Sequence, residues 1–312
     1  YAVIEMGASR KGDIQYLADF AEPDIALVTN AMPAHIASFG SLETIAQTKG
    51  EIFERLGSQG TAVINLDDRF YGQWCSQAAG KKIISFSCHQ ENADVYADNV
   101  RLHSDGTPHF RLNTPVGALD VSMAVMGLHN VGNALAAAAV ALAANVDLSS
   151  IKKGLEKVTA VKGRLNPIVL GDRVIIDDTY NASPGSVKAA IDVLVEFEGR
   201  RCLLLGTMGE LGDEAEKLHR EIAVYAKQKG IDQLIAVREF AMLMVQAFGS
   251  NATAYDRLDE FLTTIDRHIN ADVVLIKGSR FTKMEAAVEH LIDVAGVLSP
   301  GQQTLDQQRG DN

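Results

Sequence analysis

Polar side chains follow several expected strands at the point where each strand ends. They lie in the stretches IEMGAS, VTNAMPAHIASFGS, IIDDTYNASPGS and LIKGSR, and they are Glu5, Asn30, His35, Asp177, Asp178, Tyr180, Asn181, Lys277, Ser279 and Arg280. Carboxylates bind hard cations, and lysine and arginine bind phosphate. Each loop taken alone is more often a solvated turn. Because ligands bind beyond the carboxyl ends of parallel strands, the four loops together predict one shared binding site.

Lys49 lies within IAQTKGEIFERL, whose apolar residues have helical spacing. It follows Ile45 by four positions, so an α-helix turns its side chain towards the sheet. A lysine at such a position commonly extends along the edge of the core and keeps its charge in water. A buried lysine near a carboxylate and a histidine can instead lose its proton and react with carbon dioxide. The resulting carbamate would be an oxygen ligand suited to Mg²⁺.

The stretch GLHNVGNALAAAAVALAA predicts a slim helix that can pack closely against another element. Asn130 and Asn133 lie one turn apart on one face near its first turn. One interpretation is that they cap the free N–H groups at the start of the helix. The other is that their amides, which carry both donors and acceptors, bind the edge of a purine base.

Strands and helices alternate along the first part of the chain, which predicts an α/β fold with a mostly parallel sheet covered by helices. Short β segments with turn signals follow between residues 95 and 126. The expected strands are 1–7, 24–30, 61–68 and 81–87, and the expected helices are 12–21, 41–56, 127–144 and 148–158, with a further short helix before residue 81.

A glycine and a proline in TAVKGRLNP predict a domain boundary, after which the α/β pattern starts again. We expect a first domain over 1–162, a second, Rossmann-like α/β domain over 163–298, and a disordered polar tail over 299–312. In the second domain, strands are expected at 173–178, 201–206, 232–237 and 272–278, and helices are expected to begin near Pro184, Asp213, Glu239, Leu258 and Phe281.

The bulk composition excludes several classes of protein. The net charge of −11 argues against a nucleic-acid partner, because a phosphate backbone requires a basic surface. There is no uncharged apolar run long enough to make a good membrane span. The cysteines Cys75, Cys88 and Cys202 are widely spaced and match neither a zinc pattern nor a disulfide framework. They indicate a reducing, cytoplasmic environment.

Seven motifs stand in the order found in the Mur ligases, and the chain resembles that family up to about residue 295. They are EMGAS…GDI, VTNAMPAHIASFGSLETIAQTKGEIF, GLHNVGNALAAAA, GRLNP, IDDTYNASPGS, LGTMGELG and IKGSR. DDTYNASP and KGSR are most similar to the branch that joins D-Ala-D-Ala to UDP-N-acetylmuramoyl-tripeptide. The resemblance implies a monomeric, cytoplasmic enzyme of peptidoglycan precursor synthesis. ATP would phosphorylate the tripeptide carboxylate, and the dipeptide amine would attack the acyl phosphate.

The resemblance also implies a nucleotide site between a central ATPase-type domain and a C-terminal ligase domain. Asn130 and Asn133, from the HNVGN pattern, would contact the adenine. Asp178 would bind the ribose hydroxyls, and Tyr180 and Asn181 would complete the second wall of the nucleotide site. Either interpretation of the two asparagines is compatible with a helix that starts at this point.

By the same resemblance, Glu5, His35 and a carbamylated Lys49 would bind Mg²⁺ between the γ-phosphate of ATP and the acyl phosphate. Arg164, from GRLNP, would reach the ATP phosphates. The residues expected on the dipeptide and acyl-phosphate side are Lys277, Ser279 and Arg280. Cations at these positions would offset the negative charge that develops on phosphate.

The chain departs from the family in one respect. Mur ligases carry a glycine-rich G-x-x-G-K-[ST] loop that binds phosphate, preceded by a domain for the uridine nucleotide, and this sequence contains no Gly-Lys-Ser or Gly-Lys-Thr. We therefore expect an amino-terminally truncated ligase that is inactive by itself. Two alternatives stay open: a standalone nucleotide- or peptide-binding module, and another ligase of the superfamily, such as a diaminopimelate- or lysine-adding enzyme or a folylpolyglutamate synthase.

Overall fold

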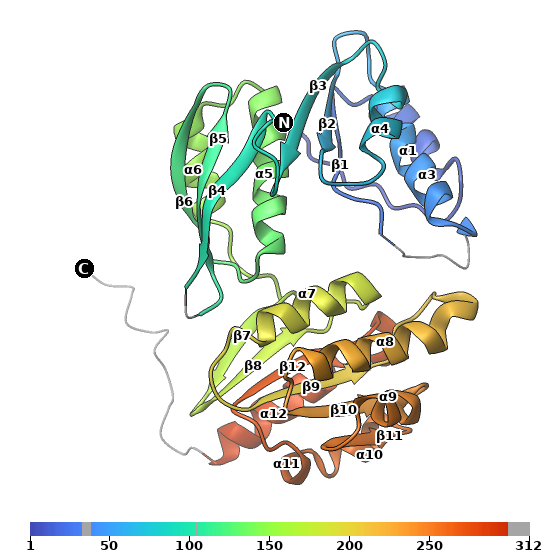
Figure 1. Ribbon diagram of the computed structural model, residues 1–312, viewed down its shortest axis with the longest axis vertical. Helices are drawn as coiled ribbons and strands as arrows, with labels where there is room; N and C mark the ends of the chain where they lie inside the picture. Colours follow the sequence, from blue (N-terminus) through green and yellow to red (C-terminus); the bar gives the residue numbers. More distant parts are fainter. Residues whose placement is uncertain (33–38, 104, 299–312) are drawn as a thin grey trace.

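The computed structural model describes residues 1–32, 39–103 and 105–298, which form two separate six-stranded sheets (Figure 1). In the first sheet the strands follow one another in chain order, with β1 to β4 parallel and β5 and β6 antiparallel. Its strands are β1 (Ile25–Val28), β2 (Thr61–Asn65), β3 (Lys82–Ser87), β4 (Val95–Leu102), β5 (Pro108–Thr114) and β6 (Gly117–Ser122).

Helices cover both faces of the first sheet. One face packs against α3 (Leu42–Glu54) and α4 (Tyr71–Gln77), and the other against α5 (His129–Ala143) and α6 (Leu148–Glu156). In β2, Ala62 and Ile64 face the first pair of helices and Val63 faces the second, as the alternation of side chains along a strand requires. The remaining helix, α1 (Asp13–Ala21), packs on α3.

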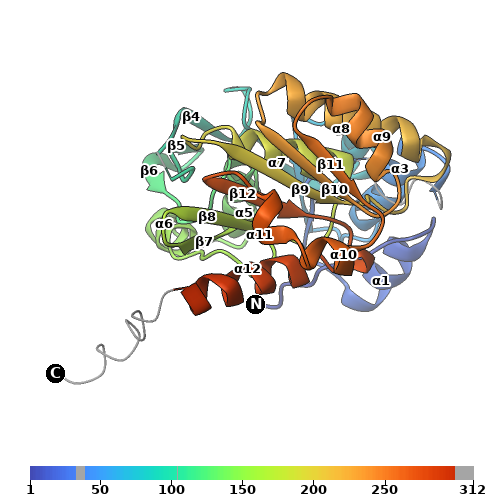
Figure 2. The same ribbon diagram turned by 90° about the horizontal axis from the view of Figure 1, so that it is seen from below.

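The second sheet has the strand order β11-β10-β9-β12-β8-β7, and all its strands are parallel except β7. The strands are β7 (Asn166–Leu170), β8 (Arg173–Asp178), β9 (Arg201–Gly206), β10 (Gln233–Val237), β11 (Ala252–Tyr255) and β12 (Val273–Lys277). Figure 2 shows helices on both faces of this sheet. The predicted fold class, a mostly parallel α/β sheet followed by a Rossmann-like α/β unit, is therefore confirmed.

The helices of the second unit divide between the two faces of its sheet. One face carries α7 (Pro184–Leu194), α8 (Ala215–Gln228) and α9 (Ala241–Phe248). The other carries α10 (Leu258–Leu262), α11 (Ile265–His268) and α12 (Glu285–Leu298). Two short 3₁₀ turns, Gly212–Glu214 and Arg280–Thr282, lie just before α8 and α12.

The strand predicted over residues 1–7 is wrong. These residues have neither helix nor strand, and the side chains of Tyr1, Val3 and Ile4 are exposed. Their apolar character suits a buried strand, but a strand is stable only when a neighbouring strand takes up its backbone hydrogen bonds. The helix expected to begin near Phe281 begins at Glu285, after the 3₁₀ turn.

The two units touch where α5 begins. Met126, just before α5, is buried in the same apolar cluster as Leu165 and Val187 of the second unit. Gly127 is so close to α7 that an added Cβ would lie 2.8 Å from a methyl carbon of Val193. Residues 157–165 connect α6 to β7 and join the two sheets (Figure 1). Among the described residues no helix is long and apolar enough to cross a membrane.

Candidate nucleotide-binding site

Lys277 and Asp178 form an ion pair at the carboxyl ends of β12 and β8. The two strands are adjacent and parallel, and their register places Lys277 directly opposite Asp178. The Lys277 ammonium lies 2.5 Å from Asp178 Oδ2 and donates to the Asn181 carbonyl at 2.8 Å. The side chains are only 3% and 12% exposed, so both charges are held inside the protein.

Burial shifts the titration of both partners. It raises the pKa of Asp178 and lowers the pKa of Lys277, and in each case the opposite charge of the partner works against the effect of burial. The charge of Arg164 adds to the lowering of the Lys277 pKa. A charged pair at such a site depends on both members, because removal of one leaves a buried and uncompensated charge.

A short arch, Gly163 to Leu165, passes over the loop that follows β8. The Gly163 amide donates to Asp177 Oδ2 at 3.0 Å and the Leu165 amide donates to Asp178 Oδ1 at 3.2 Å. The Tyr180 amide donates to the Gly163 carbonyl at 3.0 Å. Gly163 has a φ of +79°, and a Cβ there would lie 3.2 Å from the Tyr180 nitrogen, so glycine is required.

Arg164, at the top of this arch, stacks on Tyr180. Its guanidinium carbon lies 4.5 Å from the centre of the ring, and both side chains are exposed. Stacking restrains a long side chain that would otherwise move freely, and it leaves the guanidinium edge available for hydrogen bonds. The arch therefore presents a cation and an aromatic face beside the Lys277–Asp178 pair.

The two asparagines of α5 bind each other. Asn130 Nδ2 donates to the Met126 carbonyl at 2.7 Å, and Asn133 Nδ2 donates to Asn130 Oδ1 at 2.9 Å. Neither is the N-cap residue, which is Leu128 and has no side-chain capping bond. Asn133 is exposed, and its amide oxygen has no hydrogen-bond partner among the residues that the structure describes. The simple capping interpretation is therefore incomplete.

The charge of Lys277 affects the pKa of His129, the first residue of α5. Desolvation where α5 meets the second unit, and then the Lys277 charge, lower the pKa of His129, although part of the side chain stays exposed. The start of α5 and the carboxyl ends of β8 and β12 thus belong to one neighbourhood. The structure brings together Asn130, Asp178, Tyr180 and Lys277 from three segments of the chain.

Ser279 and Arg280 follow β12 and differ in burial: Ser279 is buried and Arg280 is exposed. The buried Ser279 hydroxyl donates to the Ala182 carbonyl at 3.1 Å and accepts from the Gly209 amide at 2.7 Å. It therefore connects the loops that follow β8, β9 and β12. Arg280 points to the surface, where its guanidinium lies 3.6 Å from Glu285.

Both units match known families. The model of the Mur ligase middle domain matches residues 1–141, and the model described as "Mur ligase, glutamate ligase domain" matches residues 163–280. The chain belongs to the Mur ligase family. It is 39% identical over 294 residues to the UDP-N-acetylmuramoyl-tripeptide–D-alanyl-D-alanine ligase of Escherichia coli K12, with 93% of this chain and 65% of that protein covered.

Solved Mur ligase structures have the same arrangement. A crystal structure of MurF from Acinetobacter baumannii is 35% identical, has a TM-score of 0.87, and covers 95% of this chain and 65% of that one. MurF of Thermotoga maritima, solved in complex with ADP, is 24% identical with a TM-score of 0.81 and coverages of 95% and 67%, and it supports the fold alone. This Mur ligase chain thus spans about 65% of the length of the E. coli and A. baumannii relatives.

The structure describes two of the three residues expected to bind magnesium in a Mur ligase. Glu5 is exposed in the segment that forms no strand, and His35 lies outside the described residues. Lys49 is half-buried and donates to the Asn30 carbonyl at 2.8 Å. No group of three histidine, cysteine, aspartate or glutamate side chains gathers within the described residues. The magnesium site expected from Glu5, His35 and a carbamylated Lys49 therefore stays a prediction.

Lys49 nevertheless has the expected electrostatic environment. Burial lowers the pKa of its ammonium group, and the nearby charge of Asp68 opposes that shift. Asp68 is held in place by the Ala31 amide, which donates to Oδ2 at 2.8 Å. A lowered pKa increases the share of neutral amine, which is the form that reacts with carbon dioxide.

Two further residues support this site: Asp177, which was expected at this rim without a role of its own, and His219, which was not predicted. Asp177 accepts from the Gly163 amide and from the Thr179 hydroxyl, and so holds the arch against the β8 loop. His219 of α8 is fully buried; its Nε2 accepts from the Met208 amide at 2.9 Å, and Nδ1 lies 2.7 Å from the Ala215 carbonyl. The position of His219, three before the buried Ile222, is the sequence signal that could have identified it.

Proposed function

We propose that this chain is part of an ATP-dependent ligase that joins D-Ala-D-Ala to UDP-N-acetylmuramoyl-tripeptide in peptidoglycan precursor synthesis. Membership of the Mur ligase family and similarity to proteins named for that reaction support the proposal. The observation that carries it is the buried Lys277–Asp178 pair beside the stacked Arg164 and Tyr180, facing the first turn of α5. A nucleotide needs these types of group: cations, hydroxyl acceptors and an aromatic face.

The nucleotide would lie between α5 and the β8 loop. Asn133 offers an amide to the base, and the exposed Tyr180 and neighbouring Asn181 form the opposite wall. Asp178 has two donors, Lys277 and the Leu165 amide. A carboxylate has about four lone-pair positions, so Asp178 retains capacity to accept from ribose hydroxyls.

The reaction needs positive charge where phosphate charge develops. A carboxylate oxygen of the tripeptide attacks the γ-phosphorus of ATP, the bond to ADP breaks, and an acyl phosphate forms. The amine of D-Ala-D-Ala then attacks the acyl carbon and loses a proton, and phosphate leaves. Arg164 can reach outward to the phosphates, and Lys277, Ser279 and Arg280 lie on the side proposed for the acyl group and the dipeptide. Glu5, His35 and a carbamylated Lys49 would hold Mg²⁺, which would offset further phosphate charge when bound.

We further propose that the functional units are 1–162 and 163–298, with the connection 157–165 as the hinge between them. The nucleotide would contact both units, and so its binding would favour a closed arrangement that excludes water from the acyl phosphate. Arg164 lies within this connection, so its position would change when the two units move. The intact enzyme is proposed to act as a cytoplasmic monomer.

The test is phosphate release and product formation by the protein expressed from the full reading frame that encodes these residues. Given ATP, Mg²⁺, UDP-N-acetylmuramoyl-tripeptide and D-Ala-D-Ala, we expect a product heavier by the dipeptide minus water. The variant Lys277→Met should lose turnover, and Lys217→Met, on an exposed residue of α8, should keep it. Product formed with diaminopimelate, lysine or glutamate instead of the dipeptide would assign another reaction of the superfamily.

A further inference from the structure

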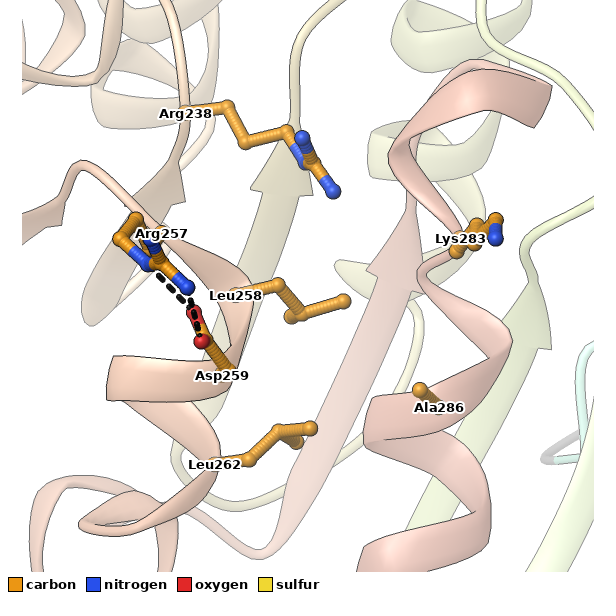
Figure 3. A pocket seen from close by; sticks show the side chains of 7 residues that line it. All are labelled: Arg238, Arg257, Leu258, Asp259, Leu262, Lys283 and Ala286. Atoms are coloured by element: carbon orange, nitrogen blue, oxygen red, sulfur yellow. Dashed lines mark hydrogen bonds and ion pairs between the residues drawn. The ribbon is translucent and has the colours of Figure 1, made fainter.

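A cavity of about 450 Å³ opens between the loop after β10 and helices α10 and α12. Figure 3 shows Arg238 on one side and the start of α10 on another, with Leu258 and Leu262 pointing towards Ala286 of α12. The interior is thus apolar, and charged groups lie around it. None of the residues that line this cavity belongs to the nucleotide site described above.

Arg238 is the one guanidinium at this cavity that has no carboxylate partner among the described residues. Its Nε is buried and makes no hydrogen bond there. Arg257, the other arginine at the cavity, is bound to Asp259, with Nε 2.9 Å from Oδ1. A buried guanidinium N–H without a partner costs free energy, and such groups in a folded protein commonly face a ligand.

The backbone aims Arg238 into the cavity. Arg238 directly follows β10 and has a φ of +75°, a left-handed conformation that is unfavourable for a side chain larger than glycine. Lys283, on the opposite side of the cavity, also has a positive φ, of +54°. Left-handed conformations outside glycine concentrate where a side chain must point in an unusual direction, such as binding sites.

The lining favours an anionic group on a partly apolar molecule. One unpaired guanidinium matches the planar, two-oxygen geometry of a carboxylate. Asp259 at the same cavity is paired with Arg257, so Arg238 and Lys283 are the cations left to bind an anion. Leu258, Leu262 and Ala286 would contact small aliphatic groups. We propose that the Arg238 cavity is a binding site for the carboxylate of a small aliphatic molecule.

The position of the cavity indicates one source for that carboxylate. Arg238 directly follows β10 and Lys277 is the last residue of β12, and β9 lies between these two strands. Neighbouring strands are about 4.8 Å apart, so these two chain positions are roughly 10 Å apart on the same rim. An extended dipeptide spans about 7 Å. The C-terminal carboxylate of D-Ala-D-Ala can therefore lie at Arg238 while its amine approaches the Lys277 side; this choice of ligand rests on the proposed function.

The experiment is an NMR titration of the 312-residue chain with four probes: D-Ala-D-Ala, its C-terminal amide, propionate and inorganic phosphate. We expect D-Ala-D-Ala and propionate to shift the amide signals of residues around Arg238. The amide, which lacks the carboxylate, should bind about tenfold more weakly or worse, because a charge-assisted pair is lost. Arg238→Gln should weaken D-Ala-D-Ala to the same degree. Arg220→Gln, on an exposed arginine of α8, is the matched control and should change nothing.

The outcomes test three claims separately: that the carboxylate site exists, that D-Ala-D-Ala is its ligand, and that the proposed function is right. Shifts by propionate but not by D-Ala-D-Ala would keep the carboxylate site and reject the dipeptide as its ligand. Equal binding of the acid and the amide, stronger binding of phosphate than of either carboxylate, or no shifts around Arg238 with any probe would overturn the inference. Because the amide needs no variant, a misfolded Arg238→Gln does not affect this result. Ligase turnover is measured separately, so the proposed function survives or fails on its own assay.

Discussion

At the scale of single residues, the Lys277–Asp178 pair connects stability with chemistry. Parallel pairing of β8 and β12 puts the two residues side by side, and the turn after β8 adds the Asn181 carbonyl as a second acceptor for the ammonium. Buried pairs of this kind contribute little net stability compared with apolar residues of the same size. The presence of this pair at the carboxyl ends of two strands therefore indicates a role in binding, where a cation in a fixed position can contact a ligand.

Replacement of Lys277 by methionine should destabilise the chain by about 3–5 kcal/mol near neutral pH, because the Asp178 carboxylate would stay buried without its partner. Burial already raises the pKa of Asp178, and loss of Lys277 removes the main opposing charge. A carboxyl with a raised folded pKa adds stability in its protonated form, and that stability is lost as pH rises through the folded pKa. The deficit of Lys277→Met should therefore shrink at about pH 5 compared with pH 7.5.

Urea unfolding of wild type and Lys277→Met at the two pH values measures this difference. Lys217→Met is the matched control, since Lys217 is exposed and pairs with Glu214 at the surface. It should unfold like the wild type at both pH values. An equal deficit for Lys277→Met at both pH values would mean that Asp178 does not carry the uncompensated charge.

Lys49 is the residue on which the carbamate hypothesis depends. Its pKa is lowered by burial, as the carbamate hypothesis requires, whereas in the structure its amine donates to the Asn30 carbonyl. In the ligase made from the full reading frame, Lys49→Ala should lower turnover by about 10–100-fold, because an oxygen ligand of Mg²⁺ would be lost. Added bicarbonate or a short carboxylate should restore part of it.

The control for Lys49→Ala is Lys82→Ala, at an exposed residue at the start of β3, which should keep normal turnover. The measurement is the initial rate of phosphate release at saturating ATP. If Lys49→Ala retained the wild-type rate, the carbamate hypothesis would be wrong. A low rate that no carboxylate restores would instead assign Lys49 a structural role on α3.

At the scale of elements, apolar runs and turn residues were sufficient to predict most strands. β8, β9, β10 and β12 each follow a buried run, and all four were expected close to where they lie. β7 was missed because Pro167 indicates a break, yet an edge strand tolerates proline, since only one side of it must donate hydrogen bonds. β11 was missed because its four residues are too short for a clear pattern.

The candidate site was predictable only in part, since its neighbours come from strand order. DDTYNASP and KGSR could be placed at strand ends from the sequence, but nothing local indicates that β12 inserts between β9 and β8. That insertion is what brings Lys277 to Asp178. Likewise, the apolar Tyr1, Val3 and Ile4 predict a strand only if a neighbouring strand is available to pair with them.

His219 gives a prediction for the loop after β9. Burial lowers the pKa of His219, so the neutral ring is favoured in the folded state. Its stabilising contribution is therefore complete above the ordinary histidine pKa and is lost as pH falls from about 6.5 towards the lowered folded value. His219→Phe leaves the buried Met208 amide without an acceptor and should cost about 1–3 kcal/mol at pH 7.5.

The cost of His219→Phe should be smaller at about pH 5, where protonation of His219 already destabilises the wild type. Unfolding free energies from denaturant titrations at both pH values test this sign. His89→Phe, at an exposed position, should show no such convergence with the wild type. A cost that grows on acidification would contradict the assignment of His219 as a neutral acceptor.

At the scale of the whole molecule, the start of α5 connects the two units. Met126 is buried in the core of the second unit although α5 packs on the first sheet, and His129 senses the charge of Lys277. Movement of one unit against the other must therefore displace Met126 from its cluster. Any ligand that bridged Asn133 and Tyr180 would act on this same contact, and its binding would be coupled to the relative position of the units.

The last prediction concerns ATP. The chain keeps the groups proposed for the base and ribose, Asn130, Asn133 and Asp178, but its sequence has no Gly-Lys-Ser or Gly-Lys-Thr to bind the phosphates. Charge-assisted bonds to phosphate are worth roughly 1.5–3 kcal/mol each, so the absence of several should weaken binding by orders of magnitude. We expect a dissociation constant of about 1 mM or weaker for ATP, and adenosine should bind nearly as well as ATP.

Calorimetry of the 312-residue chain with ATP and with adenosine tests this expectation, and Asp178→Asn should weaken both ligands equally because the ribose is common to them. We also expect no ligase turnover from this chain, since transfer depends on a positioned γ-phosphate. Micromolar ATP binding, or a large preference for ATP over adenosine, would show that Arg164, Lys277 and their neighbours form a complete phosphate site by themselves. In that case the transfer step would have to be reassigned to these residues.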